Sequence, residues 1–326
     1  MTNLLKFLHW LVLCFLVFFV TFLSSLLFFK FFYFYDLKRS ENSNNLDIYN
    51  LKNSKDEKSK VSLFLAGDVM LGRSVMIRGY KDGDFVFPFK WVANALRSSD
   101  IAFFNLESPI IDSCPMKDSG YIFCTSKSFV EGLKFSGVDV VNLANNHIEN
   151  YGKNGLDQTI RYLSEAGILT TGVGKLVKIE KKGLTFGFLG FDKSEQVNPK
   201  LNKDEVDLIL ESDKEVDILV VSMHWGVEYR DRALESVRIL AKEIMEYGAD
   251  VIMGHHPHWV QDWDFINGKP VFYSLGNFVF DQMWSEETKK GLAVELIYDV
   301  NGNISDYKLM PTYMVSVGQP KFINAQ

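Results

Sequence analysis

Acidic, amide and histidine side chains stand directly after short apolar runs at several points along this 326-residue chain. Asp68 follows the apolar run 61–66, and Glu107 follows the run 100–106. The full set is Asp68, Asn105, Glu107, Asn145, Asn146, His147, His224, His255, His256 and His258. Carboxylate, amide and imidazole groups without cysteine suit divalent ions such as Mn, Fe or Zn. The pattern therefore predicts a site for one or two divalent metal ions.

These side chains can meet only if the runs before them are strands that end at the same edge of a fold. From Val61 onwards, apolar runs alternate with segments of helical period, which is typical of βα units in an α/β fold. We expect strands at 61–66, 100–106, 138–144, 168–171, 185–191, 216–223 and 249–253, and helices at 89–97, 129–135, 156–166 and 233–247. Asn-Gly dipeptides at 267–268 and 301–302 predict two hairpins. Ligands of open α/β sheets bind outside the carboxyl ends of the strands, so we expect the metal site there.

The first sixty residues differ in composition from the rest. From Phe7 to Phe29 there are 23 residues without Asp, Glu, Lys or Arg. A helix of that length spans about 34 Å, which is enough for a hydrocarbon core of about 30 Å. We predict a transmembrane signal anchor within residues 1–35, a flexible polar tether over 36–60 and one folded domain over 61–326.

The charges are also unevenly distributed. Residues 61–326 hold 27 Lys and Arg against 36 Asp and Glu, a net charge of −9. An acidic body of this kind argues against a nucleic-acid partner. Lys30, Lys38 and Arg39 follow the apolar run, and the positive-inside rule alone would place the body in the cytoplasm. Long domains translocate largely regardless of such charges, so this count does not decide the orientation.

Two cysteines of the body lie close in sequence. Cys114 and Cys124 are ten positions apart, with turn-forming residues between them. They could close a small disulfide loop if the body meets an oxidising compartment, or remain two free thiols. Three cysteines in the whole chain exclude both a four-cysteine zinc site and a disulfide-dense scaffold.

Six short strings resemble the CapA family of capsule, or poly-γ-glutamate, biosynthesis proteins. They are GDVMLGR at 67–73, NLES at 105–108, ANNH at 144–147, HWG at 224–226, GHHPH at 254–258 and SLGNF at 274–278, in the order of the family. That family is similar to the calcineurin-like metallophosphoesterases. The resemblance implies a layered α/β sandwich of two sheets flanked by helices, with metals at the strand ends. It also implies a membrane-anchored protein whose body lies outside the cytoplasm.

The resemblance further implies roles for individual residues. It assigns metal binding to seven of the strand-end residues, namely Asp68, Asn105, Glu107, Asn146, His224, His255 and His258. His147 resembles the histidine that donates a proton to a leaving group. Arg73, at the end of the first motif, could hold negative charge that develops on the substrate. We therefore regard His147 and Arg73 as the candidate catalytic residues.

Three features depart from the phosphoesterase pattern. Met70 stands where such enzymes usually carry a metal-binding histidine, and a thioether is a poor ligand for a hard metal. The second motif is Asn-x-Glu, without the usual aspartates. Two residues separate His255 from His258, so His256 could replace either of them. These departures leave open whether one or two metal ions bind.

Several functions are compatible with these residues. The first is a metal-dependent hydrolase or transferase that acts, through a metal-bound hydroxide, on an envelope polymer such as poly-γ-glutamate or on a phosphoester. The second is a non-catalytic accessory subunit of a polyglutamate synthase or exporter, with a structural or vestigial metal site. A generic extracellular binding module is the third. The expected partners are the membrane, the polymer or phosphoester, and synthase or exporter subunits. We take the hydrolase, with its body outside the cytoplasm, as the working prediction.

Overall fold

The computed structural model describes residues 60–323, and its first strand, β1 (Val61–Val69), shows how the layers form. Leu63 and Leu65 of β1 face a cluster between two sheets, whereas Phe64 and Ala66 face a cluster under helices. Successive side chains of a strand point to opposite faces, so an apolar run like this one is buried on both sides. β1 therefore lies in the middle of a layered molecule.

The first sheet has eight strands and contains β1. Its spatial order is β16 (Gln319–Phe322), β15 (Ile304–Ser316), β14 (Lys290–Tyr298), β1, β2 (Ile101–Leu106), β5 (Val140–Asn142) and β6 (Leu169–Thr171), with β13 (Asn277–Val279) paired to the end of β1. The strands β1, β2, β5 and β6 are parallel. Their carboxyl ends consequently lie at the same edge of the sheet.

The second sheet has six strands and the same mixed character. Its order is β11 (Trp263–Ile266), β12 (Lys269–Phe272), β10 (Val251–His255), β9 (Ile218–His224), β8 (Leu184–Asp192) and β7 (Val177–Lys181). The four central strands are parallel, and the two edge strands are antiparallel to their neighbours. A short pair, β3 (Ile110–Ile111) and β4 (Thr125–Ser126), lies apart from both sheets.

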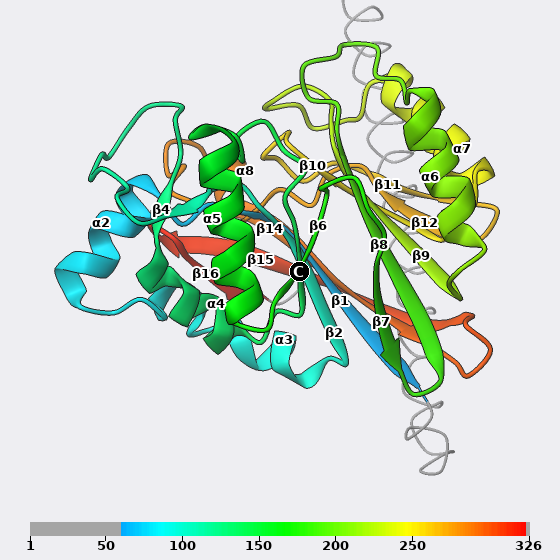
Figure 1. Cartoon of the computed structure of the whole chain (residues 1–326), viewed down its shortest axis with the longest axis horizontal. Helices are drawn as coiled ribbons and strands as arrows, with labels where there is room; N and C mark the ends of the chain where they lie inside the picture. The colour runs from blue at the N-terminus through cyan, green and yellow to red at the C-terminus, as the bar shows by residue number, and fades with distance from the viewer. Residues whose placement is uncertain (1–59, 324–326) are drawn as a thin grey trace, which may run out of the picture. The chain divides into compact units, whose positions relative to one another are not determined.

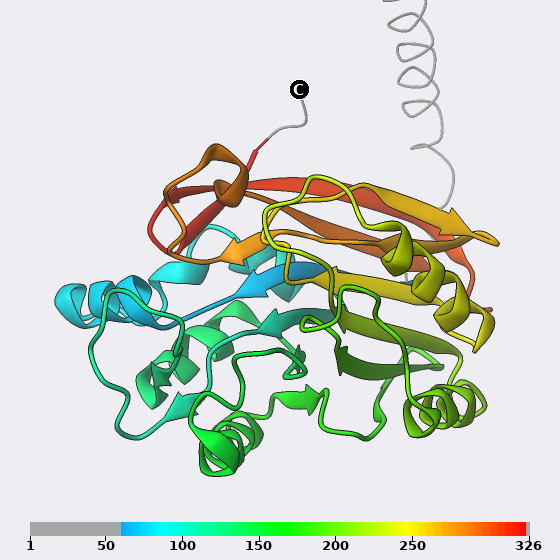
Figure 2. The same cartoon turned by 90° about the horizontal axis from the view of Figure 1, so that it is seen from above.

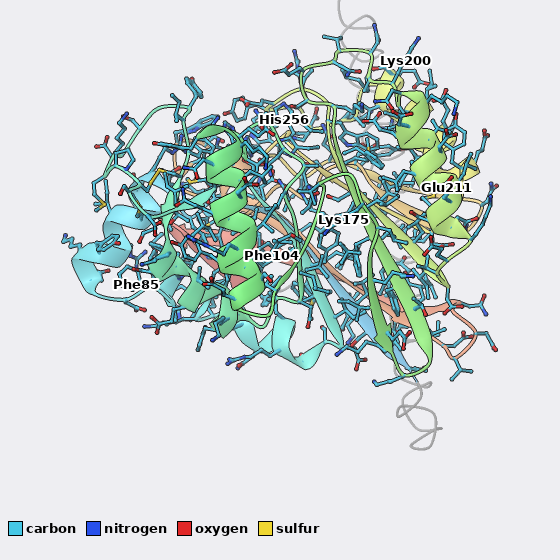
Figure 3. All side chains as sticks on the ribbon, viewed as in Figure 1. Phe85, Phe104, Lys175, Lys200, Glu211 and His256 are labelled. Atoms are coloured by element: carbon cyan, nitrogen blue, oxygen red, sulfur yellow. A yellow bond between two sulfur atoms is a disulfide. The ribbon has the colours of Figure 1, made fainter. Side chains whose placement is uncertain are left out.

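Helices cover the outer faces of the two sheets (Figures 1 and 2). The first sheet is covered by α2 (Arg73–Asp82), α3 (Ala93–Ser98), α4 (Val130–Ser136) and α5 (Gly152–Glu165). The second is covered by α6 (Lys203–Asp213) and α7 (Glu235–Glu246). The short helix α8 (Glu286–Lys289) precedes β14, and 3₁₀ turns span Phe87–Phe89 and Lys127–Phe129. Phe104, labelled in Figure 3, packs in the cluster between the first sheet and its helices.

Two glycines allow the strand ends to approach other backbone segments closely. A Cβ atom on Gly67 would lie 1.9 Å from the carbonyl oxygen of Gly276, and one on Gly254 would lie 2.0 Å from that of Tyr273. Neither position can carry a side chain without displacing backbone. The residue after each glycine is a predicted ligand, so close packing of these strands directly precedes the site.

The main features predicted from the sequence are present. The described residues form a mixed α/β fold with two large sheets and helices outside them. Both Asn-Gly hairpins are confirmed, since Ile266 pairs with Lys269 and Tyr298 pairs with Ile304. The prediction omitted the helices α2, α6 and α8 and the short strands β3, β4, β7 and β16.

The predicted membrane anchor lies outside the region that the structure describes. This applies to all of residues 1–35 and to the tether over 36–60 except Lys60. Among the described residues 60–323, no helix combines the length and the apolar character needed to cross a bilayer.

Candidate metal centre

The strand ends of both sheets meet at one edge of the sandwich, and the predicted ligands lie there. Asp68 and Asn105 are register partners across β1 and β2 of the first sheet. His224 and His255 are register partners across β9 and β10 of the second. The two pairs are in contact, because His255 Nδ1 lies 3.0 Å from Asp68 Oδ1. The fold thus joins side chains that are far apart in the sequence.

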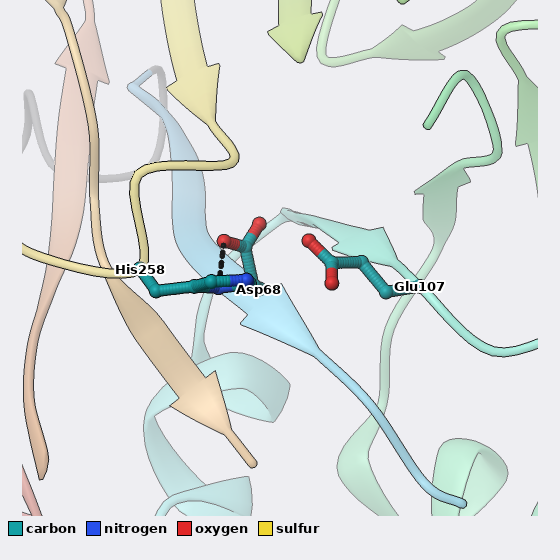
Figure 4. Close-up of side chains that lie close together, drawn as sticks. All are labelled: Asp68, Glu107 and His258. Carbon is teal, nitrogen blue, oxygen red and sulfur yellow. Dashed lines mark ion pairs between the residues drawn. The ribbon is translucent and has the colours of Figure 1, made fainter. Parts of the chain in front are cut away.

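Asp68, Glu107 and His258 form the centre of this site. One potential ligand atom from each lies within 4.8 Å of the others, and all three side chains are buried. Figure 4 shows Asp68 between His258 and Glu107, with His258 Nδ1 3.3 Å from Asp68 Oδ2. Two carboxylates and an imidazole are a donor set that divalent transition metals accept.

Buried atoms without hydrogen-bond partners lie in this group and in the adjacent His255. Both ring nitrogens of His255 and the Oε2 atom of Glu107 are buried and make no hydrogen bond. The contact of His255 with Asp68 is close, but it lacks the alignment of a hydrogen bond. Buried polar atoms in proteins are ordinarily paired, and a metal ion would satisfy Glu107 Oε2 and one of the two ring nitrogens of His255. The residues therefore fit a divalent metal.

The electrostatics of the two carboxylates lead to the same conclusion. Burial raises the pKa of Glu107 well above its usual range, and the negative charge of Asp68 raises it further. Burial also raises the pKa of Asp68, but contacts with His255 and His258 outweigh it, and the pKa of Asp68 lies well below its usual range. Two acids this close compete for a single negative charge. A divalent cation would stabilise both in the ionised form.

Asn105 faces the site with its amide nitrogen. Its Nδ2 donates to Asp68 Oδ1 over 2.9 Å and to Glu107 Oε1 over 3.2 Å. The same nitrogen lies 3.3 Å from His224 Nδ1. Asn105 thus holds two carboxylates and one imidazole, whereas the sequence prediction assigned it a ligand role.

The side-chain amides of Asn142 and Asn145 fix the orientation of the Asn105 amide. Asn105 Oδ1 accepts hydrogen bonds from Asn142 Nδ2 over 3.0 Å and from Asn145 Nδ2 over 3.2 Å. Backbone groups orient both donors: Ala144 N donates to Asn142 Oδ1, and Asn145 Nδ2 donates to the carbonyl of Leu106. The amide of Asn105 cannot turn over without breaking this chain of bonds. Sequence reasoning missed Asn142, which precedes the ANNH motif by two residues.

His224, which is buried, and Asn146, which is exposed, are in contact at the site. Asn146 is exposed, and its Oδ1 lies 3.1 Å from His224 Nε2. The same nitrogen is 3.8 Å from Glu107 Oε1. Burial lowers the pKa of His224 well below its usual range, and the charge of His256 lowers it further. His224 is therefore neutral at neutral pH, which is the form that binds metals.

His258 is oriented by Asn277, for which the sequence left open a supporting role at the site or a purely structural one. Its Nδ1 lies 3.0 Å from Asn277 Oδ1, and Asn277 is the register partner of Asp68 on β13. The amide nitrogen of Asn277 donates to Gln282 Oε1 and to the carbonyl of Thr288. Asn277, from the SLGNF motif, thus holds His258 as the amides of the first sheet hold the carboxylates.

His147 lies beside the metal group in a short turn before α5. It is 8% exposed, and its Nδ1 lies 3.2 Å from Asn150 Oδ1. Burial lowers the pKa of His147 to about 4, and the neighbouring His258 and His256 lower it as well. The imidazole is therefore neutral at neutral pH in the absence of a ligand.

Arg73 is held by other protein groups. Its guanidinium forms an ion pair with Asp281, and its Nη1 donates to the carbonyl of Gly120 over 3.0 Å. The guanidinium carbon lies 4.6 Å from the centre of the Phe123 ring. The role of Arg73 in holding charge on a substrate stays a prediction. In the structure the guanidinium contacts Asp281, Gly120 and Phe123.

The residues that departed from the phosphoesterase pattern lie as follows. Met70 is buried in an apolar cluster with Phe123, Phe280 and Met314, and its sulfur accepts a hydrogen bond from Gly72 N. Its position therefore serves packing. The backbone nitrogen of His256 lies 3.4 Å from Asp68 Oδ2. The His256 ring, labelled in Figure 3, has its centre 4.9 Å from that of His224, so His256 stays an alternative ligand.

A groove of about 970 Å³ adjoins the site at Asn145 and Asn146. It runs between α5 and α6 and is lined with acidic side chains. These are Glu149, Asp192, Glu195, Asp204, Glu205, Asp207 and Glu211. Lys193 and Lys203 neutralise Glu205 and Asp207, respectively. The remaining negative charge makes the groove a poor binding surface for an anionic polymer.

The fold and the site together define a class of protein. The fold is similar to a solved structure described as a novel phosphatase from Mycoplasma pneumoniae, with a TM-score of 0.52 and 13% identity over 77% of this chain and 93% of that one. At this identity the likeness concerns the fold alone. The described region is thus a mixed α/β domain whose fold is similar to that of this phosphatase, with a buried Asp-Glu-His group that could hold a metal.

Sequence comparisons identify the family. The family model for the bacterial capsule synthesis protein PGA_cap matches residues 62–282, and this chain belongs to that family. The chain is 32% identical over 271 residues to the capsule biosynthesis protein CapA of Bacillus anthracis and 33% identical over 264 residues to the PGA biosynthesis protein CapA of Bacillus subtilis. Each alignment covers 74% of this chain, and the chain spans 65% and 69% of those relatives. The family resemblance predicted from the six motifs is confirmed.

Proposed function

We propose that this chain is a metal-dependent hydrolase or transferase of capsule or poly-γ-glutamate biosynthesis. The observation that carries the proposal is the set of buried, unpaired atoms on His255 and Glu107, next to Asp68 and His258. The process is inferred from the names of the relatives, which are described as capsule and PGA biosynthesis proteins.

The protein groups divide the chemical work between binding and proton transfer. We assign ion binding to Asp68, Glu107, Asn146, His224, His255 and His258. When bound, a divalent ion such as Mn, Fe or Zn supplies Lewis acidity to a substrate oxygen and to an attacking water. Asn105 keeps the two carboxylates in place through its amide hydrogens. The predicted ligand role of Asn105 is replaced in this proposal by a positioning role.

His147 is the proposed proton donor to the leaving group. With a pKa of about 4 the free imidazole carries no spare proton at neutral pH. A negatively charged substrate beside the ring would raise that pKa and favour the protonated form. This requirement favours a phosphoester over a neutral amide as the substrate.

An accessory role is the second candidate, and Met70 favours it. The position that usually supplies a metal-binding histidine here contributes to an apolar cluster. A site with one ion could stabilise the fold of a synthase or exporter subunit without turnover. In that case substrate assays would be negative while the metal content remained near one per chain.

We also propose that the chain is anchored to the membrane by residues 1–35 and that residues 61–326 fold as one domain outside the cytoplasm. The anchor is supported by the run of 23 residues without charge from Phe7 to Phe29. The location is supported by the disulfide between Cys114 and Cys124, since disulfides persist in oxidising compartments. Protease added to intact cells should digest the body, and a protected body would contradict this location.

The function is tested by metal analysis and parallel assays on the full chain purified in detergent. The substrates are a phosphomonoester, a phosphodiester and a γ-glutamyl amide. We expect about one bound ion per chain, with phosphoester turnover that a chelator removes and added Mn or Zn restores. Asp157→Asn, on the exposed face of α5, is the control for Asp68→Asn. Metal retention by Asp68→Asn, or absence of metal in the wild type, would contradict the proposal.

A further inference from the structure

We propose that the loop closed by Cys114 and Cys124 positions His147, and that Phe123 and Asn150 are the residues through which it acts. The catalytic part of this inference rests on the proposed function of His147. The positioning part concerns only the conformation of the His147 ring, so it can be tested in a protein without turnover.

The first contact is a ring stack next to the disulfide. Phe123 precedes Cys124 and is 3% exposed. Its ring centre lies 3.8 Å from that of His147, with 26° between the planes. An imidazole that packs on a buried phenyl ring has few free rotamers. The stack therefore restricts the direction in which His147 can point.

The second contact fixes the position of the ring proton. Asn150 Oδ1 accepts a hydrogen bond from the backbone nitrogen of Phe123 over 2.6 Å, which identifies this atom as the oxygen. The same oxygen lies 3.2 Å from His147 Nδ1. An oxygen without hydrogens can only accept, so Nδ1 must carry the proton of the neutral ring. Nε2 is left as the atom that can take up and deliver a proton.

The third set of contacts holds the loop itself. Arg73 donates to the carbonyl of Gly120 and packs on Phe123, while Asp281 holds the guanidinium. Thr125 anchors the chain after the disulfide, since its hydroxyl donates to the carbonyl of Leu71 over 2.8 Å. Phe123 is thus in contact with both residues that the sequence analysis selected as catalytic.

The disulfide is important because the loop has little core of its own. Three of its apolar side chains are exposed: Met116 by 53%, Tyr121 by 83% and Ile122 by 59%. A segment with few buried apolar contacts opens at low free-energy cost unless a cross-link restrains it. Without the cross-link, the contacts of Phe123 with His147 and Asn150 would be made only part of the time. The metal ligands lie on other elements and would keep their positions.

The test compares three changes with matched controls. Cys114→Ser/Cys124→Ser removes the cross-link, Phe123→Leu removes the stack and Asn150→Ala removes the acceptor. Cys14→Ser is the control for cysteine removal, and Asn150→Asp keeps an acceptor oxygen at the same place. We expect the three changes to lower kcat roughly tenfold or more, part of the 10²–10⁴-fold that a general acid supplies, with unchanged metal content and nearly unchanged KM. Asn150→Asp should recover most of the loss.

A second readout does not depend on turnover. Nitrogen NMR shifts of the His147 ring, assigned by comparison with His147→Gln, report which ring nitrogen carries the proton. The wild type should show the Nδ1-protonated form, and the double serine and Asn150→Ala variants should show a mixture. If these two variants keep both the wild-type tautomer and the wild-type kcat, the proposal is overturned. If no variant has turnover but the tautomer shifts as expected, the catalytic role fails and the positioning role stands.

Discussion

Asp68, His224 and His255 reach the site from the ends of buried strands, whereas His147 reaches it from a turn that an exposed, cross-linked loop supports. The first group is held by sheet register and by amides that are themselves bonded to backbone. His147 depends on its stack with Phe123, at the end of the disulfide loop, and on Asn150, which accepts from both Phe123 and His147. The comparison suggests that metal binding and proton transfer can be lost separately.

The largest expected effect is on the residues at the strand ends that are proposed to bind the metal. His255→Ala removes a buried imidazole whose ring nitrogens make no hydrogen bond, so metal content should fall to the background of the preparation and turnover should fall with it. The fold should survive, because the ring is not part of the apolar clusters. Metal analysis and a thermal melt check both points. A fully loaded His255→Ala variant would remove this residue from the site.

A different outcome is expected for His147, the proposed proton donor. His147→Ala should retain its metal and lose roughly 10²–10⁴-fold in kcat, because a general acid contributes about this factor. The control is Lys153→Ala, which truncates an exposed side chain of α5. If His147→Ala lost metal together with turnover, metal binding and proton transfer would not be separable.

A smaller effect on affinity is expected from the amide that links the carboxylates. Asn105→Ala leaves Asp68 and Glu107 without their shared donor, and removal of such outer partners typically weakens metal binding by about 10–100-fold. Asn94→Ala, exposed on α3, is the matched control. Calorimetric titration of the metal-free protein gives the affinities. Equal affinities for the two variants would argue that Asn105 is not a positioning residue.

The last expected effect is on the pH dependence of stability. The pKa of His147 is about 4 when folded and near 6.5 when unfolded, so the unfolded chain binds the proton first as the pH falls. Unfolding free energy of the metal-free protein should therefore drop between pH 6.5 and about 4, by up to about 1.4 kcal/mol per pH unit from this group. Denaturant titrations of wild type and His147→Gln measure the difference. A parallel pH dependence in both proteins would contradict the assigned burial effect.

The strands and the strand-end residues could be predicted because their determinants are local. A buried parallel strand reads as an apolar run, and the polar residue after it marks its end. The helix α2 was missed because it begins at Arg73 in a left-handed conformation and contains Gly79. The helix α6 was missed although Asn202 and Glu205 form a capping box, which is visible in the sequence.

The finer arrangement of the site could not be predicted, because it depends on contacts between distant segments. The orientation of the Asn105 amide is set by Asn142 on another strand. The contact of Phe123 with His147 exists only once the loop has folded back against the turn before α5. No pattern in the sequence relates these residues. The sequence alone therefore could not show whether Asn105 binds a metal or positions the carboxylates.

The most direct test of the central claim is anomalous X-ray diffraction from crystals of the protein prepared with Mn or Zn. We predict an anomalous peak between Asp68, Glu107, His255 and His258, at about 2.0–2.2 Å from the ligand atoms if the ion is Zn. The Asn105 amide nitrogen should remain directed at the two carboxylates. A structure in which His255 and Glu107 bind no ion while a saturating metal occupies another part of the protein would contradict the account.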